Sequence, residues 1–427
     1  MKSPKIRFKG FDGDWEQRKL SELATMHARI GWQNLRTSEF LDAGDYMLIT
    51  GTDFEDGKVN YSTCHYVEKE RYDQDKNIQI KNGNILITKD GTLGKVAYVE
   101  GLSLPATLNA GVFNVEVKDE NETDSKYLFQ FLKAPFLMDY VSKKATGGTI
   151  KHLNQNILVD FPIAMPNKAE QVRIGEYFSN LDNLITLHQK KCEQLTILKK
   201  YMLQKMFPQN GSDKPEIRFD GFTDDWEQRK LGWLVDNDVI EAPKDGNHGE
   251  KHPTSDEYVE EGIPFLMASD IRNGRVDLEN CKYITKERAE QLDKGFAQEG
   301  DVLLTHKATI GEVAILEGLQ EEYAMLTPQV TYYRILDNKR LSQKYLYAVF
   351  HSESFQNEMQ TKAAQSTRPY IGISAQQNLT ISLPCSTEEQ QRIGEYFASL
   401  DTLITLHQNK CNELKELKKF MLQNMFV

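Results

Sequence analysis

The sequence predicts an α+β protein in which two mixed α/β domains are separated by two long antiparallel helices that form a coiled coil, with an internal pseudo-two-fold repeat. Two observations carry this prediction. The chain contains the same two blocks of sequence twice, and the second block has apolar residues at helical spacing. The length of 427 residues agrees, because it suits two domains of about 100 to 200 residues with connecting elements.

The repeat is extensive. Residues 4–20 recur at 215–231 with 13 of 17 positions identical, and residues 170–207 recur at 389–426 with 27 of 38 identical. Between these blocks the two halves diverge strongly. The offset between copies grows from 211 to 219, so the second divergent region is eight residues longer. Each half therefore has repeated segments around a region that differs.

The divergent regions predict the mixed domains. Short apolar runs at residues 46–50, 85–88 and 112–117 are bounded by Gly, Asn and Asp, which is typical of strands. Residues 125–144 and 342–362 instead carry aromatic and aliphatic side chains at helical spacing. Each divergent region is therefore expected to be a globule of strands and helices.

The second block predicts the long helices, because no proline interrupts it and its apolar residues fall three and four apart. Some 37 residues would form a rod of roughly 55 Å. Neither rod can bury its apolar seam alone, so we expect the two copies to pack antiparallel. The expected seam residues are Leu181, Ile185, His188, Cys192, Leu195, Leu400, Ile404, His407, Cys411 and Leu414.

Two of these seam pairs, His188 with Cys192 and His407 with Cys411, have the composition of a zinc site. Seam positions near the middle of a helix more often hold packed His and Cys, so we predict no metal. The chain has no signal-like or membrane-spanning apolar stretch, and its five cysteines have no C-x-x-C spacing. These features predict a cytoplasmic protein with reduced thiols.

Three motifs carry a family resemblance. Trp15 to Leu20 and Trp226 to Leu231 share a Trp-Glu-x-Arg-Lys-Leu segment, and a Gly-Asn/Asp-Ile/Val-Leu strand begins at Gly83 and at Gly300. Glu170-Gln171 and Glu389-Gln390 open the long helices. In this order, and repeated, the motifs resemble the specificity subunits of type I restriction-modification enzymes over essentially the whole chain.

The resemblance implies that each divergent region is a target recognition domain that reads one half of a split, asymmetric double-stranded DNA sequence. It also implies docking of two modification (methyltransferase) subunits, which recruit restriction (endonuclease/translocase) subunits. The expected divisions are 1–167 for the first recognition domain, 168–207 for the central helix, 208–214 for a linker, 215–387 for the second recognition domain, and 388–427 for the C-terminal helix.

No catalytic site is expected in this chain. An adenine methyltransferase motif of the Asn/Asp-Pro-Pro-Tyr/Phe type, a glycine-rich cofactor loop and a phosphate-binding loop are all absent from the sequence. Glu116-Val117-Lys118 imitates part of a nuclease motif, but an alternating strand gives that triplet by chance. We therefore expect no cofactor here, and S-adenosylmethionine, ATP and Mg²⁺ in the partner subunits.

DNA contacts are predicted in loops that combine Lys or Arg with Thr, Ser and Gly, since these side chains donate to phosphates and base edges. The net charge of −11 argues against coating DNA through bulk positive charge. The candidates are Lys89, Thr92, Lys95, Lys143, Lys144, Thr146, Gly148, Thr149, Lys151 and His152 in the first half, and His306, Lys307, Thr309, Lys362, Gln365, Ser366, Thr367, Arg368 and Tyr370 in the second.

Two other functions remain open on the sequence alone. One is a stand-alone DNA-binding or regulatory protein that uses both domains without a methyltransferase. The other is a protein-assembly scaffold, which the acidic net charge slightly favours. Divergent domains on repeated helices favour DNA recognition, because they let the target sequence change while partner docking stays the same.

Overall fold

The computed structural model describes all residues except 1–3, 32–33, 145–151, 210–211, 365–368 and 427. It divides into two compact units. The first unit comprises Met1–Gln189 with Asn409–Val427, and the second comprises Lys190–Gln408. Each unit contains one divergent region together with half of each long helix.

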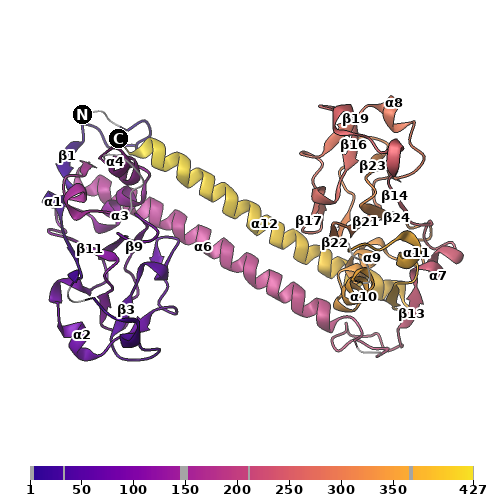
Figure 1. Ribbon diagram of the computed structural model, residues 1–427, viewed down its shortest axis with the longest axis horizontal. Helices are drawn as coiled ribbons and strands as arrows, with labels where there is room; N and C mark the ends of the chain where they lie inside the picture. The colour runs from indigo at the N-terminus through magenta and orange to yellow at the C-terminus, as the bar shows by residue number, and fades with distance from the viewer. Residues whose placement is uncertain (1–3, 32–33, 145–151, 210–211, 365–368, 427) are drawn as a thin grey trace. The chain divides into compact units, whose positions relative to one another are not determined.

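The first unit is built on two sheets (Figure 1). A six-stranded sheet has the order β2-β11-β8-β9-β5-β4, and a four-stranded sheet has the order β6-β3-β10-β7. A separate pair, β1 with β12, joins the two ends of the domain. The strands are β1 (Glu16–Lys19), β2 (Ala24–Ala28), β3 (Met47–Ile49), β4 (Phe54–Glu55), β5 (Lys58–Val59), β6 (His65–Tyr66), β7 (Gln79–Ile80), β8 (Ile85–Thr88), β9 (Val96–Tyr98), β10 (Ala106–Leu108), β11 (Val112–Val117) and β12 (Pro162–Met165).

The second unit repeats this plan with more strands. A four-stranded sheet has the order β14-β24-β21-β22, a five-stranded sheet has the order β15-β19-β16-β23-β20, and β13 pairs with β25 as β1 does with β12. Its strands are β13 (Glu227–Lys230), β14 (Lys244–Asp245), β15 (Tyr258–Val259), β16 (Ile263–Leu266), β17 (Ile271–Arg272), β18 (Arg275–Val276), β19 (Lys282–Ile284), β20 (Phe296–Ala297), β21 (Val302–Lys307), β22 (Thr309–Ile315), β23 (Ala324–Leu326), β24 (Val330–Tyr333) and β25 (Thr380–Leu383).

The helical segments predicted in each domain are each broken once. Residues 125–144 form two helices, which Ala134 and Pro135 separate because proline cannot donate to the preceding turn. Residues 342–362 break at Ser352, whose hydroxyl caps the next helix by accepting from Phe355 N. The domain helices are α1 (Leu20–Leu23), α2 (Lys69–Asp73), α3 (Ser125–Lys133), α4 (Phe136–Lys144), α5 (Gln155–Leu158), α7 (Leu231–Asp236), α8 (Lys286–Ala289), α9 (Gln343–Phe350), α10 (Glu353–Ala363) and α11 (Ile373–Gln376).

The two long helices are α6 (Lys168–Lys205) and α12 (Thr387–Met425). Asn167 fixes the start of α6, since its side-chain oxygen accepts from Glu170 N at 2.9 Å. None of the helices in the described residues is long and apolar enough to cross a membrane.

Within each unit the helices run antiparallel. In the first unit Phe178 stacks on Phe426. Asp182, one turn after Phe178, forms an ion pair with Lys418, which lies about two turns before Phe426. In the second unit Lys199 binds Asp401 while Phe207 stacks on Phe397. The partner number falls as the α6 number rises, which confirms the predicted antiparallel pairing in each unit.

The first repeated block anchors each domain to its long helix. Arg7 makes two hydrogen bonds of 2.7 Å to the buried carboxylate of Glu170, and Arg218 makes the equivalent pair to Glu389 at 2.6 and 2.8 Å. Such bidentate, charge-assisted contacts fix orientation as well as distance. The repeated sequence therefore encodes a repeated anchor.

Candidate nucleic-acid interface

In the first unit, two of the predicted loops meet at one end of the six-stranded sheet. The turn after β8 begins at Lys89, whose carbonyl accepts from Leu153 N at 2.9 Å. In the same place His152 Nδ1 lies 2.5 Å from Asp90 Oδ1. The segment before α5 is thereby held against the turn after β8. We call this sheet end, residues 89–94 with 152–153, the first loop edge.

Thr88 shapes the turn at the first loop edge. Its hydroxyl oxygen accepts from Lys95 N at 2.9 Å, and its carbonyl accepts from Gly94 N at 2.9 Å. Gly94 has a φ of 71° and lies against Met138, so a side chain there would be strained and would clash. Thr92, at the tip, is exposed.

The second unit repeats this meeting of loops. β21 and β22 form a hairpin with Ala308 at a φ of 70°, and Lys307 pairs with Tyr370 in an isolated bridge. His306 fixes the second loop twice, since its carbonyl accepts from Ile371 N at 3.1 Å and its Nδ1 lies 2.9 Å from Ile371 O. We call residues 306–309 with 370–371 the second loop edge.

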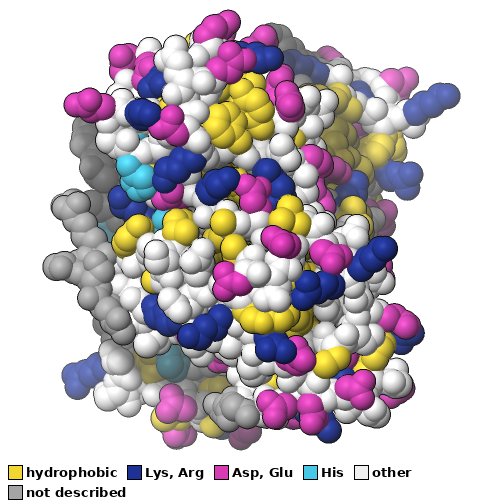
Figure 2. All heavy atoms as spheres, turned by 90° about the vertical axis from the view of Figure 1, so that its right-hand side faces the viewer, with side chains coloured by type: hydrophobic (Ala, Val, Ile, Leu, Met, Phe, Trp, Pro, Cys, Tyr) yellow, Lys and Arg dark blue, Asp and Glu magenta, His cyan; other side chains and the backbone are white. Residues whose placement is uncertain are grey.

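The predicted DNA-contacting residues differ in their exposure to solvent. Lys143, Lys144, Lys307, Thr309 and Tyr370 are exposed, and Lys89 is half-buried over the Phe113 ring at 5.6 Å. Figure 2 displays one face of the second unit, where Lys and Arg side chains are intermixed with Asp and Glu over the whole face.

Three predicted residues make structural contacts. Lys95 donates to Phe54 O at 3.2 Å, while Lys362 donates to Asn378 O and pairs with Glu358, both at 2.8 Å. His306 is fully buried, and burial lowers the pKa of its ring. Thr146, Gly148, Thr149, Lys151, Gln365, Ser366, Thr367 and Arg368 lie outside the described residues.

A third loop lies at each edge and was not predicted from loop composition. The register of β2 on β11 and of β14 on β24 places the residues after Ala28 and after Asp245 at the same sheet ends as the loops above. In the first unit this loop holds Arg29, which is buried and donates to Leu108 O at 2.8 Å. The third loop of the second unit could have been predicted from the run Gly246-Asn247-His248-Gly249, because residues of this kind are typical of loops.

On the long helices, the predicted seam residues Leu181, Ile185, Leu195, Leu400, Cys411 and Leu414 are buried, and His188, Cys192, Ile404 and His407 are half-buried. Among the described residues, no group of three or more His, Cys, Asp or Glu could hold a metal ion. All five cysteines are described, and none forms a disulfide.

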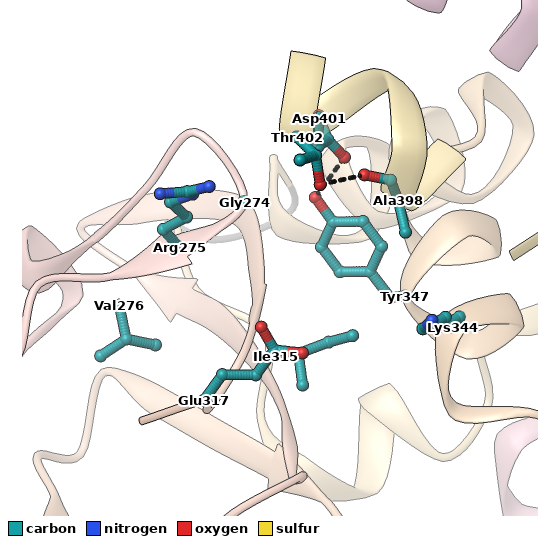
Figure 3. A pocket seen from close by; sticks show the side chains of 10 residues that line it. All are labelled: Gly274, Arg275, Val276, Ile315, Glu317, Lys344, Tyr347, Ala398, Asp401 and Thr402. Atoms are coloured by element: carbon teal, nitrogen blue, oxygen red, sulfur yellow. Dashed lines mark hydrogen bonds between the residues drawn. The ribbon is translucent and has the colours of Figure 1, made fainter. Parts of the chain in front are cut away.

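Each unit also has a crevice between a short hairpin with two-residue strands, a domain helix and a long helix. In the second unit it encloses 430 Å³ between the β17–β18 hairpin, α9 and α12. Figure 3 shows the Tyr347 hydroxyl pointing to Asp401, to which it donates at 2.9 Å, while Arg275 extends from the hairpin. The equivalent crevice of the first unit encloses 50 Å³ between the β4–β5 hairpin, α3 and α6.

Electrostatics differ between these equivalent places. In the first unit burial and the nearby Lys418 lower the pKa of Lys133 to about 8. In the second unit the position of Lys133 is taken by His351, where burial and the nearby Lys199 lower the ring's pKa to about 4. Both groups lie where a domain meets its long helix.

A family model agrees with this architecture. The model described as "Type I restriction modification DNA specificity domain" matches residues 12–196 and 223–416, one match in each half of the repeat. Together the two matches cover most of the chain. The fold, with two mixed recognition domains and long helices, is thus that of a type I specificity subunit. The chain belongs to this family, and the resemblance seen in the sequence is confirmed.

Curated relatives and solved structures agree. The MjaVIII specificity subunit of Methanocaldococcus jannaschii is 26% identical over 358 residues, which cover 81% of this chain and 78% of the relative. The EcoBI specificity subunit of Escherichia coli is 22% identical and covers 80% and 73%. The crystal structure of an S subunit from M. genitalium matches with a TM-score of 0.63 and 15% identity over 100% of this chain and 99% of that one.

Proposed function

We propose that this protein selects the DNA site for a type I restriction-modification enzyme. Each recognition domain reads one half of a split, asymmetric double-stranded sequence, and the helices dock two modification subunits. The chain itself is non-catalytic, so adenine methylation and cleavage are carried out by the partner subunits, which supply S-adenosylmethionine, ATP and Mg²⁺.

One observation carries the DNA-reading part of the proposal. In both units three loops that differ in sequence come together at the same end of an otherwise repeated sheet. Loops on a rigid scaffold can change what they bind without changing the fold. Two edges of different composition, Lys89 with His152 and Lys307 with Tyr370, suit a site whose halves have different sequences.

Exposed apolar residues support the docking part. In the first unit Leu187 is 62% exposed on α6, and Leu184, Leu417 and Phe420 are exposed on the two helices. In the second unit Leu406 is 61% exposed, together with Leu403, Leu198 and Tyr201. These positions repeat with the sequence, so each unit offers nearly the same apolar surface. Large exposed apolar side chains that cluster in this way are typical of partner contacts.

The surface lies away from the domain contact. At 3.6 residues per turn, Leu184 lies about 200° around α6 from Asp182. Asp182 faces the domain, because it accepts from Gln130 Nε2 at 3.0 Å and pairs with Lys133 at 3.6 Å. A partner helix packed on Leu184 and Leu187 would therefore not displace the domain.

The test of DNA selection is to purify the chain with the modification subunit encoded beside it and to map methylated adenines in DNA exposed to the complex. A single split motif is expected, with binding that weakens as salt rises. If the complex forms but methylates no split motif, the function is wrong. If the chain alone binds a split site and never joins a modification subunit, the stand-alone function takes its place.

The test of docking uses matched variants. Leu187→Glu with Phe420→Glu alters the first unit, and Leu406→Glu with Tyr201→Glu alters the second. Each pair should leave a complex with one modification subunit instead of two, as measured by native mass spectrometry. Thermal unfolding of the free chain should not change, because all four side chains are already exposed.

A further inference from the structure

A histidine with a buried carboxylate, His248 with Asp245, lies in the third loop of the second unit, whereas the histidine and carboxylate of the first loop edge, His152 and Asp90, are both exposed. His248 Nε2 lies 2.8 Å from Asp245 Oδ2. Asp245 is only 3% exposed at its side chain, whereas the His248 side chain is 51% exposed. The buried carboxylate thus binds the imidazole through Nε2, and the rest of the ring is open to solvent.

The buried carboxylate of Asp245 is stabilised in its charged form by two neighbours. Burial alone would raise the pKa of Asp245, but hydrogen bonds from Lys294 and His248 bring it below its ordinary value. Lys294 forms an ion pair with the other carboxylate oxygen. A buried carboxylate fixes which ring nitrogen of a histidine carries the proton. In the tautomer whose Nε2–H donates to Asp245, Nδ1 carries a lone pair and can accept a hydrogen bond.

The loop around His248 is fixed in place. Asn247 is buried, donates to Lys294 O at 2.7 Å and accepts from Asp293 N at 3.1 Å. A Cβ on Gly246 would lie 1.8 Å from Leu326 O, so the backbone passes where only glycine fits. A side chain on such a loop loses little freedom when it binds.

The sheet register places His248 among the other reading loops. Asp245 pairs with Thr331 and Thr305 pairs with Val330, so β14 and β21, which flank β24, stop at the same end of the sheet. His306, one residue past Thr305, is within electrostatic range of both Asp245 and His248. Lys307 follows His306 and pairs with Tyr370, so His248 lies beside the second loop edge.

Unsatisfied polar atoms lie beside this loop. Among the described residues, His306 Nε2 and Thr327 Oγ1 are buried without a hydrogen-bond partner. Thr327 adjoins the loop, because its carbonyl accepts from Gly246 N at 3.3 Å. Buried polar groups in folded proteins almost always have partners, so this edge has the character of a surface that a polar ligand completes.

We infer that His248 is a specificity-determining residue that reads a base of the second half-site through Nδ1. A lone pair accepts from an exocyclic amino group, which in the major groove is N6 of adenine or N4 of cytosine. This inference rests on the proposed function. The first domain has Ala28 at the register position of Asp245 and Gly31 three residues later, so it reads its half-site without this contact.

The test uses the complex with the modification subunit and DNA carrying its methylation motif. Each adenine or cytosine of the motif, apart from the adenine that is methylated, is replaced in turn by purine or by the pyrimidinone that lacks N4. For the wild type, one replacement should weaken binding about tenfold, the size of one lost hydrogen bond to a charged or well-oriented group. In His248→Phe the same replacement should have no effect.

Two further variants sharpen the result. His248→Gln can donate to Asp245 and accept from the base, so it should keep part of the preference. His152→Ala alters the exposed histidine of the first loop edge and should leave the identified position unaffected. Thermal unfolding should change little, since Asp245 keeps its ion pair with Lys294, and His248→Phe should be slightly less stable than His248→Gln because it loses the hydrogen bond to Asp245.

The outcomes separate the two proposals. If His248→Phe keeps every base preference of the wild type, the inference is overturned while the proposed function stands. If the wild-type complex selects no split site, the proposed function fails and the inference with it.

Discussion

The two crevices beside the long helices are lined by equivalent residues, yet one is nearly closed and the other is open. In the first unit, 50 Å³ remain because Lys58 of the hairpin donates to Asn183 of α6 at 2.8 Å and Lys133 donates to Asp56 O at 2.9 Å. In the second unit, 430 Å³ remain. Thr402, which replaces Asn183, donates to Ala398 O within its own helix.

This difference separates two kinds of contact between domain and helix. The anchor of Arg7 on Glu170 is repeated by Arg218 on Glu389, and both lie in the repeated blocks. The hairpin contact lies in the divergent region and is not repeated. The arginine–glutamate anchor is therefore common to both units, whereas the contact between the hairpin and the long helix differs between them.

The largest effect should come from breaking the anchors. Arg7→Ala leaves the fully buried Glu170 carboxylate without its partner, which costs about 3 to 5 kcal/mol. Arg218→Ala should cost less, because Trp226 Nε1 still donates to Glu389 at 3.3 Å, whereas Trp15 Nε1 has no partner among the described residues. Denaturant unfolding of both variants measures the costs, and equal costs would contradict the comparison.

The next effect depends on pH. His351 has a pKa of about 4 in the folded chain, below its ordinary value, so the unfolded chain binds the proton first as pH falls. Its contribution to stability is complete above pH about 6.5 and is lost towards pH 4, by up to about 3 kcal/mol. His351→Gln should flatten this loss in urea titrations between pH 7 and 4.

The equivalent Lys133 titrates in a different range. Its folded pKa of about 8 also lies below the ordinary value, so stability should rise as pH increases above 8. Lys133→Met should remove that rise between pH 8 and 9.5 and should leave unchanged the loss of stability between pH 6.5 and 4. A rise that survives the substitution would show that another group is responsible.

A moderate effect is expected from the carboxylates between the helices. Asp182→Asn removes the charge that Lys133 and Lys418 share, whereas Asp401→Asn removes only the partner of Lys199 and leaves an amide for Tyr347. We expect a loss of about 2 kcal/mol for Asp182→Asn and about half of that for Asp401→Asn. Thermal unfolding of the two variants side by side provides the measurement.

The smallest effect concerns the hairpins. Lys58→Ala should cost about 0.5 kcal/mol, since it removes a single solvent-exposed hydrogen bond. Arg275→Ala at the equivalent position should cost nothing measurable, because no hydrogen bond to that side chain is found among the described residues. Amide exchange should become faster in the β4–β5 hairpin only. Faster exchange in both hairpins would show that the two hairpins contact their helices alike.

The repeat made most of the fold predictable. The spacing of Leu181, Ile185 and Leu195 indicated long helices, and their duplication indicated antiparallel pairing, which each unit has. The breaks at Pro135 and Ser352 were not predicted, although a proline and a capping serine were both visible. Apolar spacing continues across such breaks, so spacing alone does not locate them.

The site was only partly predictable. Composition located the turns at Lys89 and Lys307, but the third loop was missed because its place depends on strand register, which joins residues almost 90 apart in the sequence. Composition also could not tell that Lys95 and Lys362 are held by backbone carbonyls. Which residues are free to bind is decided by tertiary contacts.

The composition of the first unit also bears on the order in which the protein forms. Phe426 stacks on Phe178 and touches Tyr127 and Phe131, so a residue that follows the whole second unit in the chain completes the core of the first domain. The second unit, Lys190–Gln408, is continuous and needs no later residue. Removal of residues 409–426 should therefore open the aromatic core of the first unit and leave the second unit whole.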